Sequence, residues 1–144
     1  MIPTLQTILH DPENGKHGNC FSAVLASLLH MDIDAIPVFM TTDWVREVNK
    51  WLRPHGLAYL LVDPSIADVL KDQGVTGLWH EIAGNTVRSN DVIHACVALD
   101  CTTNYDPHPS NDGLTNTVNV GIFVALEPWR AILSTTDTEG RKDE

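Results

Sequence analysis

Residues 17–29 have the sequence HGNCFSAVLASLL, in which a glycine-containing polar loop passes directly into an apolar run. The apolar side chains after Cys20 recur at helical spacing, which predicts a helix over about residues 20–30 with one buried face. Asn19 is a residue type favoured at the N-cap, so Cys20 would stand in the first turn. The helix dipole and the unpaired backbone N–H groups there favour a thiolate, which is the nucleophilic form of cysteine. The stretch therefore predicts a nucleophile at the start of a buried helix.

Similar patterns predict two more helices, from Thr42 or Asp43 to about Arg53 and from Ser65 to about Gln73. Short apolar runs bounded by turn residues predict strands near residues 57–62, 78–82, 92–99, 103–106 and 118–126. Helices come first and strands dominate the second half of the chain. This order predicts an α+β fold, in which the N-terminal helices pack on a mostly antiparallel sheet. Residues 1–19 read as an extended lead-in and a polar loop with a turn at 11–15.

Length and composition limit the possible classes of protein. The 144 residues are enough for one domain, which we expect over residues 1–134, with a polar, disordered tail over 135–144. A net charge of −10, from 19 acidic and 9 basic residues, argues against a nucleic-acid partner and against adsorption to anionic membranes. Three cysteines make no disulfide framework, and the sequence has no signal peptide or membrane span, so we expect a cytoplasmic protein. No phosphate-binding glycine loop is present in the sequence, and we expect no cofactor.

His94 is the candidate general base. It lies in the predicted strand over residues 92–99, where it would share a face with Cys96 and Ala98. The alternate residues, which are Ile93, Ala95, Val97 and Leu99, read as the core face. The small side chains beside His94 leave room for a neighbouring helix start, where Cys20 is expected.

Asp106, at the end of the next predicted strand, is the candidate that orients the imidazole. A carboxylate that accepts from one ring nitrogen fixes the tautomer and leaves the other nitrogen for the thiol. Asp100 is the rival carboxylate, because it is nearer to His94 in sequence. Cysteine at a helix start, histidine on a strand and aspartate after the next strand suit thiol-dependent acyl transfer.

The chain also needs a donor for the oxyanion that forms during acyl transfer. The backbone N–H of Cys20 is one source, and the side-chain amide of Gln6, Asn14 or Asn19 is a candidate for the second. A metal site is the alternative use of these residue types, with ligands drawn from His17, Cys20, His94, Cys96 and Cys101. Because no paired C-x₂-C motif exists in the sequence, we expect no metal.

Residues 18–29 resemble the nucleophile helix of papain-like cysteine peptidases, most closely that of the bacteriocin-processing branch. His94 with its apolar strand, and Asp106 followed by Pro107, resemble the histidine and aspartate segments of that branch. Small phage-encoded and prophage-encoded proteins of this type are similar over nearly the whole chain. The resemblance implies a papain-like fold.

The resemblance also implies site roles by position. Cys20 matches the nucleophile, His94 the base, Asp106 the orienting acid and Gln6 the upstream oxyanion glutamine. Two features differ from the peptidases. Thirteen residues separate Gln6 from Cys20 where the peptidases have only a few, and Phe21 stands where they have glycine.

We therefore expect a cysteine-dependent amide hydrolase or acyl transferase with a Cys-His-Asp triad. Its substrate would be a peptide, a protein or a small amide. The alternative is a catalytically inactive papain-like scaffold that acts as a protein-binding or inhibitory module. A third hypothesis is a metal-stabilised interaction domain.

Overall fold

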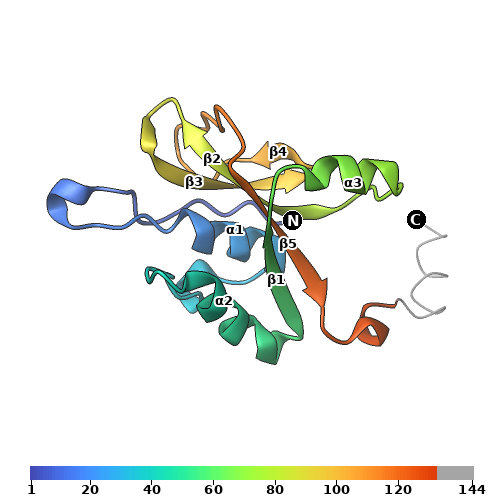
Figure 1. Ribbon diagram of the computed structural model, residues 1–144. Helices are drawn as coiled ribbons and strands as arrows, with labels where there is room; N and C mark the ends of the chain where they lie inside the picture. The colour runs from blue at the N-terminus through green and yellow to red at the C-terminus, as the bar shows by residue number, and fades with distance from the viewer. Residues whose placement is uncertain (133–144) are drawn as a thin grey trace, which may run out of the picture.

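The computed structural model describes residues 1–132, which contain three α-helices and five β-strands (Figure 1). The helices are α1 (Cys20–Leu29), α2 (Trp44–Leu52) and α3 (Ile66–Asp72). The strands are β1 (Leu57–Val62), β2 (Trp79–Thr86), β3 (Ser89–Leu99), β4 (Thr102–Tyr105) and β5 (Asn119–Ala125). Every predicted element is present, although β2 and β3 are longer than predicted, and the α+β class is confirmed. The predicted tail over 135–144 lies outside the described residues.

The five strands form one sheet in the order β1-β5-β2-β3-β4, and every neighbouring pair is antiparallel. The β3–β4 turn consists of Asp100 and Cys101, with φ of 51° and 63°. Two left-handed residues are what a type I′ turn requires, and this turn matches the twist of the strands it joins. The Asp100 carboxylate accepts hydrogen bonds from the backbone of Gly77 and Leu78, which holds the turn in place.

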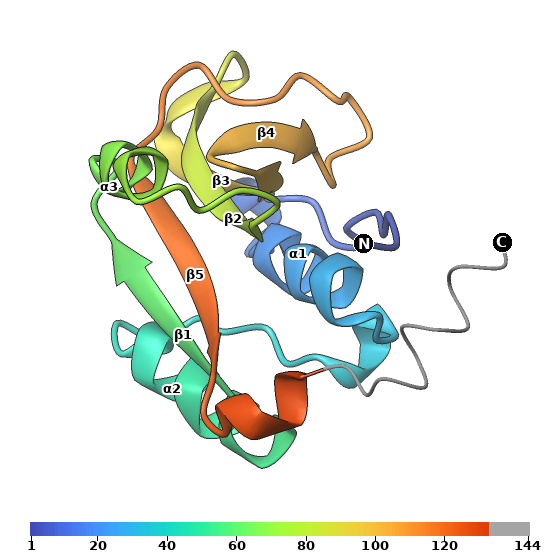
Figure 2. The same cartoon turned by 90° about the vertical axis from the view of Figure 1, so that its right-hand side faces the viewer.

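Helices cover both faces of the sheet (Figure 2). On one face, Val24 of α1 packs against Ala95 and Val97 of β3. On the other, Cys96 and Ala98 of β3 are buried in a cluster that includes Ile66 of α3; its remaining buried members are Ile82 and Val120. The predicted core face of β3 is confirmed at Ala95 and Val97, but the opposite face, with Cys96 and Ala98, is buried as well. Ile93, assigned to the predicted core face, is 45% exposed, although it lies within the strand.

Phe21 joins α1 to the second helix. Its ring lies 5.4 Å from that of Trp44 and 5.5 Å from that of Tyr59, measured between centroids. Val48 and Leu52 of α2 are fully buried in the same cluster, as the apolar spacing of that helix predicts. The ring of Phe21 therefore packs inward, where edge-to-face aromatic contacts are favourable.

The first 19 residues form a lead-in and a projecting loop (Figure 1). The lead-in is anchored at both ends: Ile2 donates a backbone hydrogen bond to Ser27, and Gln6 donates one to Pro107. The loop then leaves the body of the protein and closes on itself through a bridge between Asp11 and Lys16. Within residues 1–132, no helix is both long enough and apolar enough to cross a bilayer.

Candidate active site

Cys20 is the first residue of α1 and is partly buried. Asn19 occupies the N-cap position, as predicted, but its side chain makes no capping hydrogen bond. Its amide oxygen instead accepts from the backbone of Thr7 and Ile8, at 3.0 and 2.9 Å. Asn19 thus ties the lead-in to the helix start. The first-turn N–H groups, including that of Cys20, have no intrahelical acceptor.

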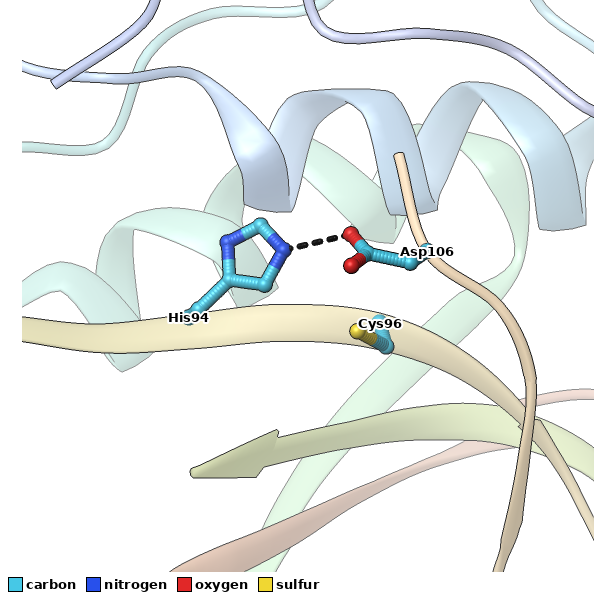
Figure 3. A group of neighbouring side chains, drawn as sticks. All are labelled: His94, Cys96 and Asp106. Atoms are coloured by element: carbon cyan, nitrogen blue, oxygen red, sulfur yellow. Dashed lines mark hydrogen bonds and ion pairs between the residues drawn. The ribbon is translucent and has the colours of Figure 1, made fainter. Parts of the chain in front are cut away.

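His94 lies in the part of β3 that pairs with β2 but no longer with β4. The last residue pair between β3 and β4 joins Val97 to Tyr105, three residues short of His94. The chain then continues into Asp106, whose carboxylate Oδ1 accepts a 2.7 Å hydrogen bond from Nε2 of His94 (Figure 3). The His94 imidazole and the Asp106 carboxylate therefore meet at the open edge of β3. The structure brings these two predicted residues together.

Asp106 is held by three hydrogen bonds and is only 3% exposed. Besides the His94 bond, Oδ1 accepts from the backbone N–H of His108 and Oδ2 from that of Gly113, each at 2.8 Å. Burial raises the pKa of this carboxyl, but the three hydrogen bonds outweigh burial and lower the pKa to about 2. Asp100, the rival, is committed to the β3–β4 turn. Asp106 is thus a fixed, ionised partner for the imidazole.

The imidazole of His94 also contacts two thiols. Because Nε2 is engaged by Asp106, Nδ1 remains for a second partner, and the Cys20 thiol lies close enough to the ring to contribute to its raised pKa. Burial lowers the pKa of His94, but hydrogen bonds with Asp106, Cys20 and Cys96 outweigh burial and raise the pKa to about 11. The ring is therefore an imidazolium at neutral pH.

His94, Cys96 and Asp106 could in principle hold a metal ion, because one ligand atom from each lies within 4.8 Å of the others. The chemistry of the donor set does not fit one. Both Asp106 oxygens are already hydrogen-bonded, and burial raises the pKa of the Cys96 thiol, which disfavours the thiolate that a metal requires. Cys101 lies in the β3–β4 turn, at the other end of β3 from His94.

The three candidate oxyanion amides differ in position. Asn14 hydrogen-bonds with Asp11 in the exposed turn of the projecting loop, away from Cys20, and the Asn19 amide is occupied by the lead-in. Gln6 is buried, and its Nε2 donates to the carbonyl of Ile8 at 2.9 Å, which leaves its second N–H free. A Cβ on Gly18 would lie 3.4 Å from that Nε2. Of the three residues, only Gln6 lines the cavity that also contains Cys20 and His94.

Cys20 lies on the wall between two cavities. One, of about 330 Å³, extends from Cys20 toward Trp44 and the sheet face around Ala83. The other, of about 580 Å³, contains Gln6 and His94 and lies beneath the projecting loop. A substrate that crosses Cys20 would thus have a cavity on either side of the sulfur.

The sequence reasoning missed Glu81, which lies on the floor of the smaller cavity and is 2% exposed. Burial raises the pKa of Glu81 to about 7, although Tyr59 and the Gly121 backbone donate hydrogen bonds to its carboxylate. The signal available in the sequence was weak: Glu81 is an acidic residue in the predicted strand over residues 78–82, directly after His80. Asn119, which lines the same cavity, carried no such signal.

Comparisons of the chain with protein-family models, with curated proteins and with solved structures found no match.

Proposed function

We propose that this protein is a papain-like, cysteine-dependent amide hydrolase or acyl transferase that acts on a peptide or protein. The observation that supports this function best is the shared imidazole. His94 lies beside Cys20 on the wall of one cavity, while its Nε2 donates to the buried Asp106 carboxylate at 2.7 Å. This is the arrangement by which an orienting acid and a general base activate a nucleophile.

In the proposed first half-reaction, the Cys20 thiolate attacks the substrate carbonyl and a C–S bond forms. The carbonyl π electrons move to oxygen, and the oxyanion accepts hydrogen bonds from the Cys20 backbone N–H and from Gln6 Nε2. The intermediate then collapses as the C–N bond breaks. His94 gives its Nδ1 proton to the leaving amine, and Asp106 keeps the ring in place through Nε2.

In the second half-reaction, water or an amine attacks the thioester carbonyl. Neutral His94 takes a proton from the attacking group, and the C–S bond breaks to return the thiolate. Hydrolysis and amide transfer differ only in the acceptor that enters at this step.

The alternative, an inactive scaffold that binds a partner, would be supported by a Cys20 sealed in the core or a His94 turned away from it. Cys20 instead lines both cavities, and it shares the larger one with His94. These placements favour the enzyme over the binding module.

The test is iodoacetamide labelling of the folded protein at pH 7, with each of the three cysteines quantified by peptide mass spectrometry. We expect Cys20 to react at least about tenfold faster than Cys96 or Cys101, and His94→Ala to remove this advantage. His108→Ala is the matched control, because that ring lies 6.0 Å from the His94 ring between centroids. Equal labelling of the three thiols would refute the proposal. An acylating probe that marks wild type but not Cys20→Ala would extend the test to acyl transfer.

A further inference from the structure

The smaller cavity has an acidic floor beneath apolar walls. Its walls include Phe39 and Trp44, and its floor is the sheet face that carries Glu81, Ala83 and Asn119. At about 330 Å³ it has room for one long side chain next to the Cys20 sulfur. The proposed acyl-transfer mechanism uses none of these residues.

Two hydrogen bonds and the space above a glycine hold the Glu81 side chain in this floor. Tyr59 donates its hydroxyl to Oε2 of Glu81 at 2.9 Å, and the backbone of Gly121 donates a further hydrogen bond. Gly121 has no side chain at a point where a Cβ would collide with both Tyr59 and Glu81. The fold thus reserves space for a carboxylate whose burial is costly, since charge taken out of water must be paired to be stable.

Asn119 supplies a second acceptor on the same floor. It lies on β5 opposite Ala83, two residues before Gly121, so its side chain leaves the sheet on the same face as that of Glu81. Its amide oxygen is buried and has no hydrogen-bond partner within residues 1–132. Buried polar atoms in proteins are normally paired, so an unpaired acceptor on a residue that lines a cavity indicates a missing donor.

We propose that this cavity receives a cationic side chain of the substrate, lysine or arginine, next to the carbonyl that Cys20 attacks. The inference rests on the proposed function and names its substrate class. A cation with several N–H donors satisfies both acceptors at once, and the apolar walls match the methylene stem of lysine or arginine. The net charge of −10 also favours approach of a basic substrate.

The experiment compares three chloroacetamides whose amide nitrogen carries a 4-aminobutyl, a 4-(trimethylammonio)butyl or a pentyl group. The Cys20 sulfur forms a bond to the methylene carbon as the C–Cl bond breaks and chloride leaves. Rates at Cys20 are followed by peptide mass spectrometry. We expect the aminobutyl probe to react about tenfold faster than the pentyl probe, as a charge-assisted hydrogen bond would produce. The trimethylammonio probe, which has charge but no N–H donor, should fall between them.

Glu81→Gln should reduce the aminobutyl preference to about twofold or less, because a neutral amide replaces the carboxylate. Glu47→Gln is the matched control: it removes the same charge from the exposed surface of α2 and should leave the preference unchanged. Equal rates for the aminobutyl and pentyl probes in wild type, or an unchanged preference in Glu81→Gln, would overturn the inference. If Glu81→Gln does not fold, the relative rates of the three probes on wild type still test the cation pocket.

The same data separate this inference from the proposed function. If Cys20 reacts faster than Cys101 with the aminobutyl and pentyl probes alike, only the cation pocket is refuted. If Cys20 reacts no faster than Cys101 with any probe, the activated nucleophile is refuted. In that case, the ratio of the aminobutyl rate to the pentyl rate at Cys20 still tests the cation pocket.

Discussion

Replacing Asp106 with asparagine tests whether the carboxylate holds the His94 proton. The substitution keeps the shape of the side chain but removes its charge and replaces one acceptor oxygen with an NH₂ group. In the native protein both oxygens accept, Oδ1 from His94 and His108 and Oδ2 from Gly113. The NH₂ of asparagine would therefore face an N–H donor whichever way the amide is turned.

The size of the effect follows from burial and pairing. Removing one member of a buried charge pair costs about 3–5 kcal/mol, and the remaining amide oxygen preserves part of the bonding, so we expect a loss of about 3 kcal/mol in the free energy of unfolding. Burial lowers the pKa of His94, and the hydrogen bond with the Asp106 carboxylate is the main effect that raises it. Removing the carboxylate leaves the effect of burial largely unbalanced. The pKa of His94 should therefore fall from about 11 toward the ordinary histidine value of 6.5.

Two assays measure these quantities: urea unfolding followed by tryptophan fluorescence, and NMR titration of the imidazole Cε1–H signals. The His94 signal is assigned by its disappearance in His94→Gln. Asp100→Asn is the control, because that carboxylate caps the β3–β4 turn and leaves His94 untouched. A His94 ring in Asp106→Asn that titrates as in wild type would show that the carboxylate does not hold the proton. So would an unfolding free energy within about 0.5 kcal/mol of wild type, the range of ordinary surface substitutions.

Three further predictions concern the same elements. Gln6→Ala should lower the rate of acyl transfer about 10²–10³-fold without changing alkylation of Cys20, which forms no oxyanion, whereas Asn14→Ala should change neither rate. Gly121→Ala should reduce the free energy of unfolding by about 1–3 kcal/mol in urea titrations, because its methyl group would overpack the floor of the smaller cavity. The excess stability of wild type over Asp106→Asn should depend on pH. The lowered pKa of Asp106 contributes stability above 3.8 that is lost as pH falls toward 2, and the raised pKa of His94 contributes stability below 6.5 that is lost as pH rises toward 11. Unfolding measured from pH 3 to 10 should therefore give the largest difference between about pH 4 and 6.5, and a flat difference would contradict the linkage.

The parts of the site that the sequence predicts are those encoded by local pattern. A polar loop before a helical run places Cys20 at a helix start, and an apolar run rich in branched residues places His94 on a strand. The turn after the next short strand places Asp106. Each pattern fixes a local backbone state, and antiparallel pairing of neighbouring strands then brings the last two residues together.

The parts that could not be predicted depend on long-range packing. Thirteen residues separate Gln6 from Cys20 because the chain leaves the body of the protein between them, and the Asp11–Lys16 bridge closes that loop. The loop returns Gly18 to the side of Gln6, although many residues intervene. A count of residues along the chain cannot show that two positions meet across a closed loop.

Glu81 was missed for a related reason. Alternation along a strand indicates which residues share a face, but not whether that face is covered. A carboxylate on a strand therefore reads as solvent-facing until the neighbouring strand is known. Only the insertion of β5 between β1 and β2 places Tyr59 and Gly121 against Glu81, and β5 comes from the other end of the sequence.

The position of the candidate site follows from the difference in length between β3 and β4. β3 has 11 residues and β4 has four, so the part of β3 that carries His94 has no partner on that edge. A longer β4 would cover this edge with backbone, and Asp106 would then continue the ladder instead of turning back toward the imidazole. An unpaired edge invites pairing with another chain, and proteins cover such edges with loops. Here the segment after β4 and the lead-in, joined by the hydrogen bond from Gln6 to Pro107, supply that cover. The same two segments carry Asp106 and Gln6 toward Cys20. The residues that cover the sheet edge therefore also build the proposed catalytic site.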